Sequence, residues 1–407
     1  HAMESQYWND EVQQSAWLLD YDRRCMLDCA DTFQNLAAVM GEMNWELEQE
    51  KTPDDREELL RRRQAMESRK QYAAHMRQMA GMLQSVADTS VQLIRLGGRQ
   101  EKQIVRALAG EGIVVEDIYL LRGKEDRLQI TISVRLTKNK SMTVEEIAGY
   151  LSVLMDIRLV PQKRNPYFVG EESVSLYFEE EPIFSCLTAA ACATEETESV
   201  SGDSYSFLET DDSVAMILSD GVGSGESAAR DSGRIVDLTE RILDAGLGPD
   251  MAMLFLNGMA GAEGDENRMA TLDLCRIDLY RGECETVKAG GAAGFIKRSD
   301  RVEKIQSRQL PLGMSASEDI SEKKWQLNSG DLVILVSDGV VQNWPCGDGE
   351  YLLEQKIASL NVSSPVDLAN LILRYAIRQC GGKIRDDMTV LVTGIWKNEE
   401  REIEDIE

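Results

Sequence analysis

Histidine is almost absent from this chain, which has two of them in 407 residues, at positions 1 and 75. None of the eight cysteines forms a Cys-x-x-Cys pair, and both histidines stand far from the cysteines in the sequence. A zinc site is therefore not predicted. Catalysis by a serine or cysteine with a histidine base, or through a phosphohistidine, is disfavoured as well. The scattered cysteines are expected to be reduced thiols of a cytoplasmic protein.

Long apolar runs and positive charge are also scarce. No apolar run reaches the ~18 residues that a membrane-spanning helix needs. Lys and Arg number 44 against 71 Asp and Glu, which gives a formal net charge of −27. Nucleic-acid binding and electrostatic docking on anionic lipid both need positive charge, so neither is expected. Much of the acidic surplus can serve solubility.

The length of the chain predicts two or three domains rather than one core. Residues 1–3, His-Ala-Met, have the look of a cloning scar, so the natural chain is expected to begin upstream. The sequence then changes in character near residues 98 and 179, and it ends in an acidic tail over 397–407.

Residues 4–97 are predicted to form a long helical hairpin of coiled-coil character. Apolar residues recur at alternating spacings of four and three, and Pro53, in a turn at 51–55, is well placed to open the second helix. The seam consists of Trp8, Val12, Ser15, Leu19, Asp22, Met26, Cys29, Phe33, Leu36, Met40, Met43, Leu47, Met76, Met79, Leu83, Val86, Ser90 and Leu93. Pairing within one chain, self-association and a partner helix are three open alternatives.

Residues 98–178 are predicted to form a small α/β domain that carries no recognisable chemistry. We expect a helix over 99–110, an alternating strand over 128–136, and a further strand over 174–178. Thr143 and Glu146 form a capping-box pattern for a helix that runs to about Met155. A regulatory domain, an interaction domain and a spacer all fit this pattern.

Residues 179–396 are predicted to form an α+β sandwich, because runs of short strands are interrupted by paired helices. Helices are expected over 226–245, 249–260 and 365–378. Strands are expected over 271–279, 284–289, 294–297, 332–336 and 389–393.

Carboxylates stand at the ends of three of these strands. The apolar runs 214–218 and 332–336 are each followed by Ser-Asp-Gly, which contributes Asp220 and Asp338. The pair Asp386–Asp387 precedes a third apolar run. A single Ser-Asp-Gly is commonly a tight turn, but three strand-end acids are costly to bury without a partner. Oxygen ligands of this kind suit Mg²⁺ or Mn²⁺.

These acids can be assigned to a binuclear site for phosphoryl transfer, in which carboxylates hold two dications and one of them bridges. Asp220 suits the bridge, and the backbone oxygen of Gly221 can approach a metal. Asp338 and one member of the Asp386–Asp387 pair suit terminal ligation, and Asp203 suits an outer position. The glycines over 221–225 could suggest a phosphate-binding P-loop, but the Gly-Lys-Ser/Thr ending is missing.

Several motifs in this order resemble the metal-dependent serine/threonine phosphatases of the PPM (PP2C-like) family: Gly-Asp-Ser-Tyr at 202–205, two copies of Ser-Asp-Gly, Leu-Pro-Leu-Gly at 310–313 and Asp-Asp-Met-Thr-Val at 386–390. More closely, Thr-Leu-Asp-Leu at 271–274 and Gly-Phe-Ile-Lys-Arg at 294–298 look like the stage II sporulation protein E family of endospore-forming bacteria. The likeness covers about residues 180–396 and is looser upstream.

The resemblance implies an α-β-β-α sandwich with two Mn²⁺ or Mg²⁺ ions at one edge. It implies that Asp220, Asp338 and Asp386 are catalytic and that the metal-binding positions are Asp203, Asp220, Gly221, Asp338 and Asp386. Asp387 then matches a position usually held by asparagine. No arginine matches the phosphate clamp of eukaryotic PPM enzymes, and the small-residue loop at 288–294 can be a mobile flap or a plain pair of turns.

The family further implies a phosphorylated anti-anti-sigma factor as the substrate, activation of a sporulation sigma factor, and control by the upstream regions. It also implies a membrane region, a place on the cytoplasmic face of the division septum, self-association, and contact with the bacterial tubulin-like division protein. This stretch itself is expected to be soluble and cytoplasmic. The alternative function is a septal scaffold that uses the hairpin while the phosphatase domain is idle; intact acids at every metal position favour the enzyme.

Overall fold

The computed structural model describes residues 26–27, 29–35, 37–38, 73–74, 76–77, 79–84, 92–94, 98–122, 127–138, 140–221, 223–244, 246–262, 270–306, 311–312, 323–342, 344 and 348–398. They belong to two compact units, one up to Glu181 and one from Pro182 onward. Within these ranges no helix combines the length and the apolar character that crossing a membrane requires.

The predicted hairpin over 4–97 falls mostly outside the described ranges. Those of its residues that are described between 26 and 38 and between 73 and 84 are helical. The seam prediction is wrong at its end, because Leu93 lies in strand β1 (Gln92–Ile94), which pairs antiparallel with β2 (Ile113–Arg122). A seam defined by spacing takes no account of hydrogen bonds to a distant strand, and here that pairing decides the local structure.

The rest of the first unit is a five-stranded sheet in the order β1-β2-β3-β7-β5, with helices α4 (Gly98–Gly110) and α5 (Val144–Met155) packed into its core. Its other strands are β3 (Leu128–Leu136), β5 (Leu159–Pro161) and β7 (Val174–Glu180), and a separate small ladder joins β4 (Met142–Thr143) to β6 (Phe168–Val169).

The predicted start of α5 is confirmed in detail. The Glu146 backbone N–H donates to Thr143 Oγ1 at 3.2 Å, and the Thr143 N–H donates to Glu146 Oε2 at 2.7 Å. These reciprocal bonds satisfy two donors that the first turn leaves free. The expected alternation in β3 is confirmed too, since Ile130, Ile132 and Val134 are buried.

The second unit contains two five-stranded antiparallel sheets. The first has the order β15-β12-β11-β10-β9 and the second has the order β14-β13-β16-β17-β8. In the first sheet the strands are β9 (Asp203–Glu209), β10 (Ser213–Asp220), β11 (Leu272–Asp278), β12 (Glu283–Ala289) and β15 (Lys323–Gln326). In the second they are β8 (Phe184–Ala193), β13 (Gly294–Lys297), β14 (Val302–Ile305), β16 (Leu332–Val336) and β17 (Met388–Lys397).

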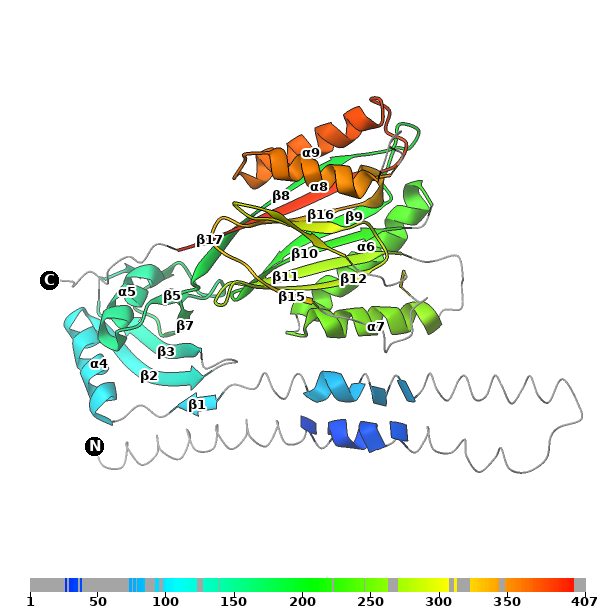
Figure 1. The fold of residues 1–407 in the computed structure, drawn as a ribbon. Coiled ribbons are helices and arrows are strands. Elements are labelled where there is room, and N and C mark those ends of the chain that lie inside the picture. The colour runs from blue at the N-terminus through cyan, green and yellow to red at the C-terminus, as the bar shows by residue number, and fades with distance from the viewer. Residues whose placement is uncertain are drawn as a thin grey trace, which may run out of the picture. The chain divides into compact units, whose positions relative to one another are not determined.

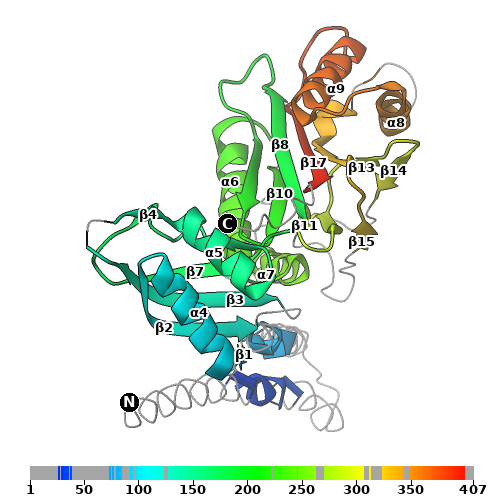
Figure 2. The same ribbon diagram turned by 90° about the vertical axis from the view of Figure 1, so that its left-hand side faces the viewer.

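Two pairs of helices cover the outer faces of this sandwich, as Figures 1 and 2 show. Helices α6 (Gly225–Asp244) and α7 (Pro249–Ala262) pack on the first sheet, and α8 (Gly349–Ser359) and α9 (Pro365–Gln379) pack on the second. A third apolar cluster, which includes Met216, Leu218, Val333 and Leu391, fills the space between the sheets. The predicted α-β-β-α sandwich is therefore confirmed.

Strands β10 and β16 are buried along nearly their whole length because apolar layers lie on both of their faces. Side chains two residues apart in a strand point to the same side. Asp220 thus continues the row of Met216 and Leu218, which faces the second sheet. The fold brings the end of this row close to the last residues of β16 and the first residues of β17.

Candidate metal centre

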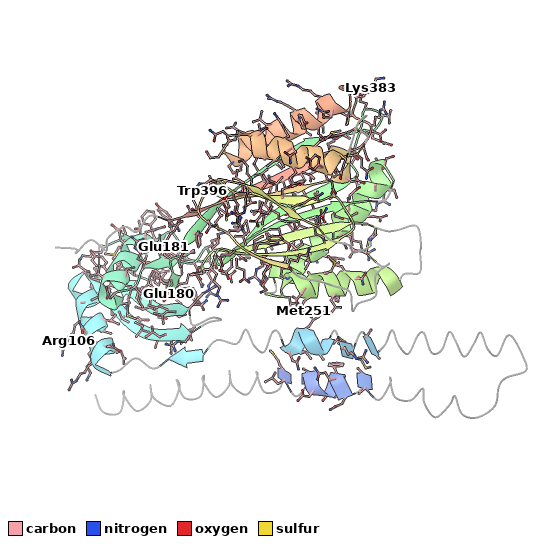
Figure 3. The ribbon with its side chains drawn as sticks, in the orientation of Figure 1. Arg106, Glu180, Glu181, Met251, Lys383 and Trp396 are labelled. Carbon is pink, nitrogen blue, oxygen red and sulfur yellow. The ribbon has the colours of Figure 1, made fainter. Side chains whose placement is uncertain are left out.

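Four carboxylates meet at one end of the sandwich. Asp220 is the last residue of β10, and its partner in the ladder with β9 is Asp203. Asp338 opens a 3-10 turn, η3 (Asp338–Val340), directly after β16. Asp386 stands two residues before β17, at the end of the connection from α9 in which Figure 3 labels Lys383. The sheet pairing thus brings together acids that are up to 183 positions apart in the sequence.

Burial and mutual repulsion raise the pKa values of three of these groups. Burial raises the pKa of Asp203 to about 7, against the opposing effect of hydrogen bonds from Thr389 and Ser337. Burial, followed by the nearby charges of Asp203 and Asp338, raises the pKa of Asp220 to about 8. The pKa of Asp386 is raised by burial and then by Asp338. Each carboxylate thus makes ionisation of the next more costly.

The donor set fits a hard divalent cation in two respects. Asp203 Oδ2 is buried and has no hydrogen-bond partner. Asp220 lies close enough to Asp338 for the charge of Asp338 to raise the pKa of Asp220, so the two groups repel when both are ionised. A cation would relieve that repulsion and engage the oxygen of Asp203. Within the described ranges, no three His, Cys, Asp or Glu side chains already surround one point as in a finished metal site.

Asp387 has a different environment from its neighbour. The residue is 6% exposed. Its Oδ1 accepts from the Glu195 N–H at 2.9 Å, and its Oδ2 accepts from the Gly202 N–H at 2.6 Å. Both oxygens are therefore used to hold the loop between β8 and β9. Asp386 is half-buried and feels the charge of Asp338. Because both oxygens of Asp387 already accept backbone hydrogen bonds, Asp386 is the member of the pair that is available to a cation.

Comparison with known proteins agrees with this architecture. The family model for stage II sporulation protein E (SpoIIE) matches residues 210–395. The chain is 30% identical over 328 residues to stage II sporulation protein E of Bacillus subtilis (strain 168), covering 79% of this chain and 39% of that protein. It is 30% identical over 306 residues to that of Priestia megaterium, covering 74% and 52%.

A solved structure decides which family the chain belongs to. The PP2C phosphatase domain and a fragment of the regulatory domain of SpoIIE from Bacillus subtilis match with a TM-score of 0.56 and 30% identity, covering 74% of this chain and 87% of that one. This chain belongs to the stage II sporulation protein E family. Its second unit is a PP2C-type phosphatase domain. The SpoIIE-family chain described here spans about two fifths to one half of the curated relatives it matches.

Sequence reasoning missed residues that hold the strand ends of this SpoIIE-family site in place. Ser219 Oγ donates to the Thr271 carbonyl at 2.7 Å, and Thr271 Oγ1 accepts from the Asp220 N–H at 3.0 Å. Ser337 Oγ donates to the Asp387 carbonyl at 3.3 Å and accepts from the Thr389 N–H at 2.9 Å. The sequence does carry a signal for these contacts, because a serine precedes the aspartate in both Ser-Asp-Gly motifs.

A buried ion pair lies one row behind the acids. Asp273 pairs with Leu218 across the β10–β11 ladder and with Lys288 across the β11–β12 ladder. Lys288 Nζ is 2.5 Å from Asp273 Oδ2, and the side chains are 4% and 3% exposed. Burial raises the pKa of Asp273 to about 6, although Lys288 acts to lower it. The SpoIIE-family site therefore has one lysine behind its acids.

The small-residue segment at 288–294 forms tight turns between β12 and β13. Gly290 and Gly291 both have a φ of 71°, a left-handed conformation that favours glycine. A Cβ at Gly291 would approach Asp273 Oδ2 to 3.1 Å, so the turn closes over the ion pair. The Ala293 N–H also donates to Glu350 Oε1 on α8 at 2.9 Å. These contacts describe packed turns and not a flap.

Both glycines of the Ser-Asp-Gly motifs meet backbone where a side chain would stand. A Cβ at Gly339 would overlap the carbonyl oxygen of Asp387, and one at Gly221 would overlap the carbonyl oxygen of Ala228 in α6. Gly339 therefore allows the turn after β16 to lie against the start of β17. Gly221 allows α6 to lie against the end of β10.

Gly339→Ala is expected to lower the free energy of unfolding by about 1–3 kcal/mol, as inserted methyl groups do in packed sites. It should also reduce phosphatase activity, because Asp387 and the adjoining Asp386 must shift. Thermal unfolding and phosphate release measure the two effects. The control is Gly149→Ala in α5, where a Cβ meets nothing within 4 Å and the change should be neutral or stabilising. Equal behaviour of the two variants would contradict the steric argument.

Proposed function

We propose that the second unit is a metal-dependent protein serine phosphatase. Two Mn²⁺ or Mg²⁺ ions would be held by the side chains of Asp203, Asp220, Asp338 and Asp386 and by the backbone oxygen of Gly221. The observation that carries this proposal is the gathering of Asp203, Asp338 and Asp386 near Asp220, with one buried oxygen of Asp203 left without a hydrogen-bond partner, at the end of a PP2C-type sandwich.

When bound, the ions would supply charge that neutralises a phosphoryl group and lowers the pKa of water. The protein's part is to orient its own oxygens. Asp220 is close to both Asp203 and Asp338, so it is the residue that would contact both ions. Ser219 and Ser337 fix the strand ends that carry Asp220 and Asp338. Asp387 fastens the loop that leads to Asp203, through its bond to the Gly202 N–H.

The substrate we propose is a phosphoserine on an anti-anti-sigma factor, whose dephosphorylation activates a sporulation sigma factor. Membership of the stage II sporulation protein E family supports it. The test is Mn²⁺-dependent phosphate release from the phosphorylated factor, compared with p-nitrophenyl phosphate. Release from the small ester alone would keep the phosphatase and reject this substrate. Release from neither would contradict the enzyme and favour an idle domain on a scaffold.

We further propose that the upstream region controls the enzyme and mediates self-association. In the full-length protein we place it on the cytoplasmic face of the membrane at the division septum, with the tubulin-like division protein as a partner. The domain limits 4–97, 98–178 and 179–396 are part of this proposal. A route for control exists at Gly221, since a movement of α6 at Ala228 must be transmitted to the residue that follows Asp220.

Three lengths of chain test this control. Residues 180–396, residues 99–407 and the whole chain are expected to differ in Mn²⁺ affinity and in turnover, because the upstream residues bias the position of α6. Calorimetric titration with Mn²⁺ measures the affinity, and phosphate release measures turnover. If all three bind Mn²⁺ equally and turn over substrate at one rate, the upstream residues do not control the site.

A further inference from the structure

Gln342 reaches the acid cluster from the turn that follows β16. The Val341 and Gln342 N–H groups both donate to the Asp338 carbonyl, at 3.0 and 2.8 Å. This places the side chain of Gln342, four residues on, beside that of Asp338. Gln342 Nε2 donates to Asp338 Oδ2 at 2.6 Å. No motif in the sequence predicts this contact.

The bond determines how the Asp338 carboxylate can rotate. A carboxylate has two oxygens, so a donor that holds Oδ2 also fixes the direction of Oδ1. The same carboxyl group lies close to Asp220, the proposed bridging ligand. Contacts of this kind to an outer residue commonly orient metal ligands and tune the metal.

The backbone of Gln342 is itself held against α9. Its carbonyl oxygen accepts from Cys380 Sγ at 3.9 Å, just past the end of that helix. Two residues further on, Trp344 Nε1 donates to the Val340 carbonyl at 3.1 Å, and its ring packs edge-on against Tyr375 with centroids 5.6 Å apart. The amide therefore extends from a fixed turn.

Charge also distinguishes glutamine from the acids around it. The end of the sandwich already gathers the carboxylates of Asp203, Asp220, Asp338 and Asp386. Gln342 adds two N–H donors and no charge, so it can hold a carboxylate without competing for a cation. An aliphatic side chain of the same length would leave the net charge as it is and remove only the hydrogen bond.

We propose that Gln342 is a positioning residue, whose amide holds Asp338 in the orientation that receives a divalent cation. This inference rests on the proposed metal site. It assigns to Gln342 no contact with substrate.

The test is Gln342→Met, which keeps the length of the side chain and the net charge. Mn²⁺ binding to the whole chain is measured by isothermal titration calorimetry, together with thermal unfolding in EDTA. We expect Mn²⁺ affinity to fall by about 10–100-fold, as for other residues that orient metal ligands. The unfolding temperature in EDTA should stay that of the wild-type protein, because Gln342 is exposed. High Mn²⁺ should then restore most of kcat.

The control is Gln355→Met on the exposed side of α8, which should bind Mn²⁺ as the wild-type protein does. Unchanged affinity in Gln342→Met, with tight binding in the wild-type protein, would overturn the positioning role alone. A wild-type protein that binds no Mn²⁺ would overturn the proposed metal site and this inference with it. If Gln342→Met lowers the unfolding temperature in EDTA as well as the Mn²⁺ affinity, the positioning role is also overturned, in favour of a role in folding.

Discussion

Asp220→Ala is expected to abolish metal-dependent phosphate release while the protein stays folded. Asp220 is close enough to Asp203 and Asp338 to feel both charges, so its removal would take a ligand from both proposed ions. Loss of a single preorganised electrostatic group in an active site typically costs at least about 100-fold in kcat, and a bridging ligand should cost more. Asp338→Ala should have the same effect.

The stability of Asp220→Ala, in contrast to its activity, should stay close to that of the wild-type protein. The raised pKa of Asp220 means that its ionised form is unfavourable in the metal-free protein, so alanine removes repulsion as well as a side chain. Thermal unfolding in EDTA should therefore change little. The matched control is Asp237→Ala on the exposed side of α6, which should keep full activity. Full activity of the wild-type protein in EDTA, or of Asp220→Ala in Mn²⁺, would refute the metal mechanism.

Lys288→Met is expected to destabilise the second unit by about 3–5 kcal/mol. It leaves Asp273 buried without its cation, and removing one member of a buried pair commonly has this cost. Asp273 Oδ1 already lacks a hydrogen-bond partner, so the buried carboxylate would lose its ion pair while that second oxygen has no hydrogen bond. Urea unfolding of the whole chain, followed by fluorescence, measures the change.

A double variant distinguishes the effect of removing the whole ion pair from the effect of removing its lysine alone. Lys288→Met with Asp273→Leu replaces both charges by apolar groups and should recover most of the lost stability. The surface control is Lys324→Met, whose side chain is 52% exposed and pairs with Glu283 and Glu285. It should change stability by about 1 kcal/mol at most. If Lys288→Met is as mild as Lys324→Met, the buried pair does not hold the fold.

The sequence allowed prediction of those features that depend on local pattern. Asp220 and Asp338 could be found because an apolar strand ends abruptly in each case, and the start of α5 could be found from its capping box. Strand β8 was missed since its Ser-Cys-Leu-Thr-Ala-Ala-Ala stretch has little intrinsic strand preference; its pairing with β17 supplies the missing stability. Helix α8 was missed although Asp348 caps its first turn.

Other features depend on pairings that no local pattern encodes. Lys288 meets Asp273 only because the β11–β12 register places them opposite each other. Gln342 meets Asp338 only because the chain turns immediately after β16. The distinction between Asp386 and Asp387 follows from two hydrogen bonds that Asp387 accepts from the loop before β9. The residues of 386–389 alone do not predict these bonds, because the donors are 192 and 185 positions away in the sequence.

The pairing of β8 with β17 has a consequence for how the protein is made. These are the first and last strands of the second unit, and they pair over ten residues from Phe184↔Lys397 to Ala193↔Met388. A ribosome therefore releases β8 long before its partner, and contacts between distant segments form slowly. The bond from the Glu195 N–H to Asp387 spans 192 residues. On a growing chain β8 waits with an unpaired edge, a state open to misassembly, and Asp386 joins the other acids only when synthesis of the unit is nearly finished.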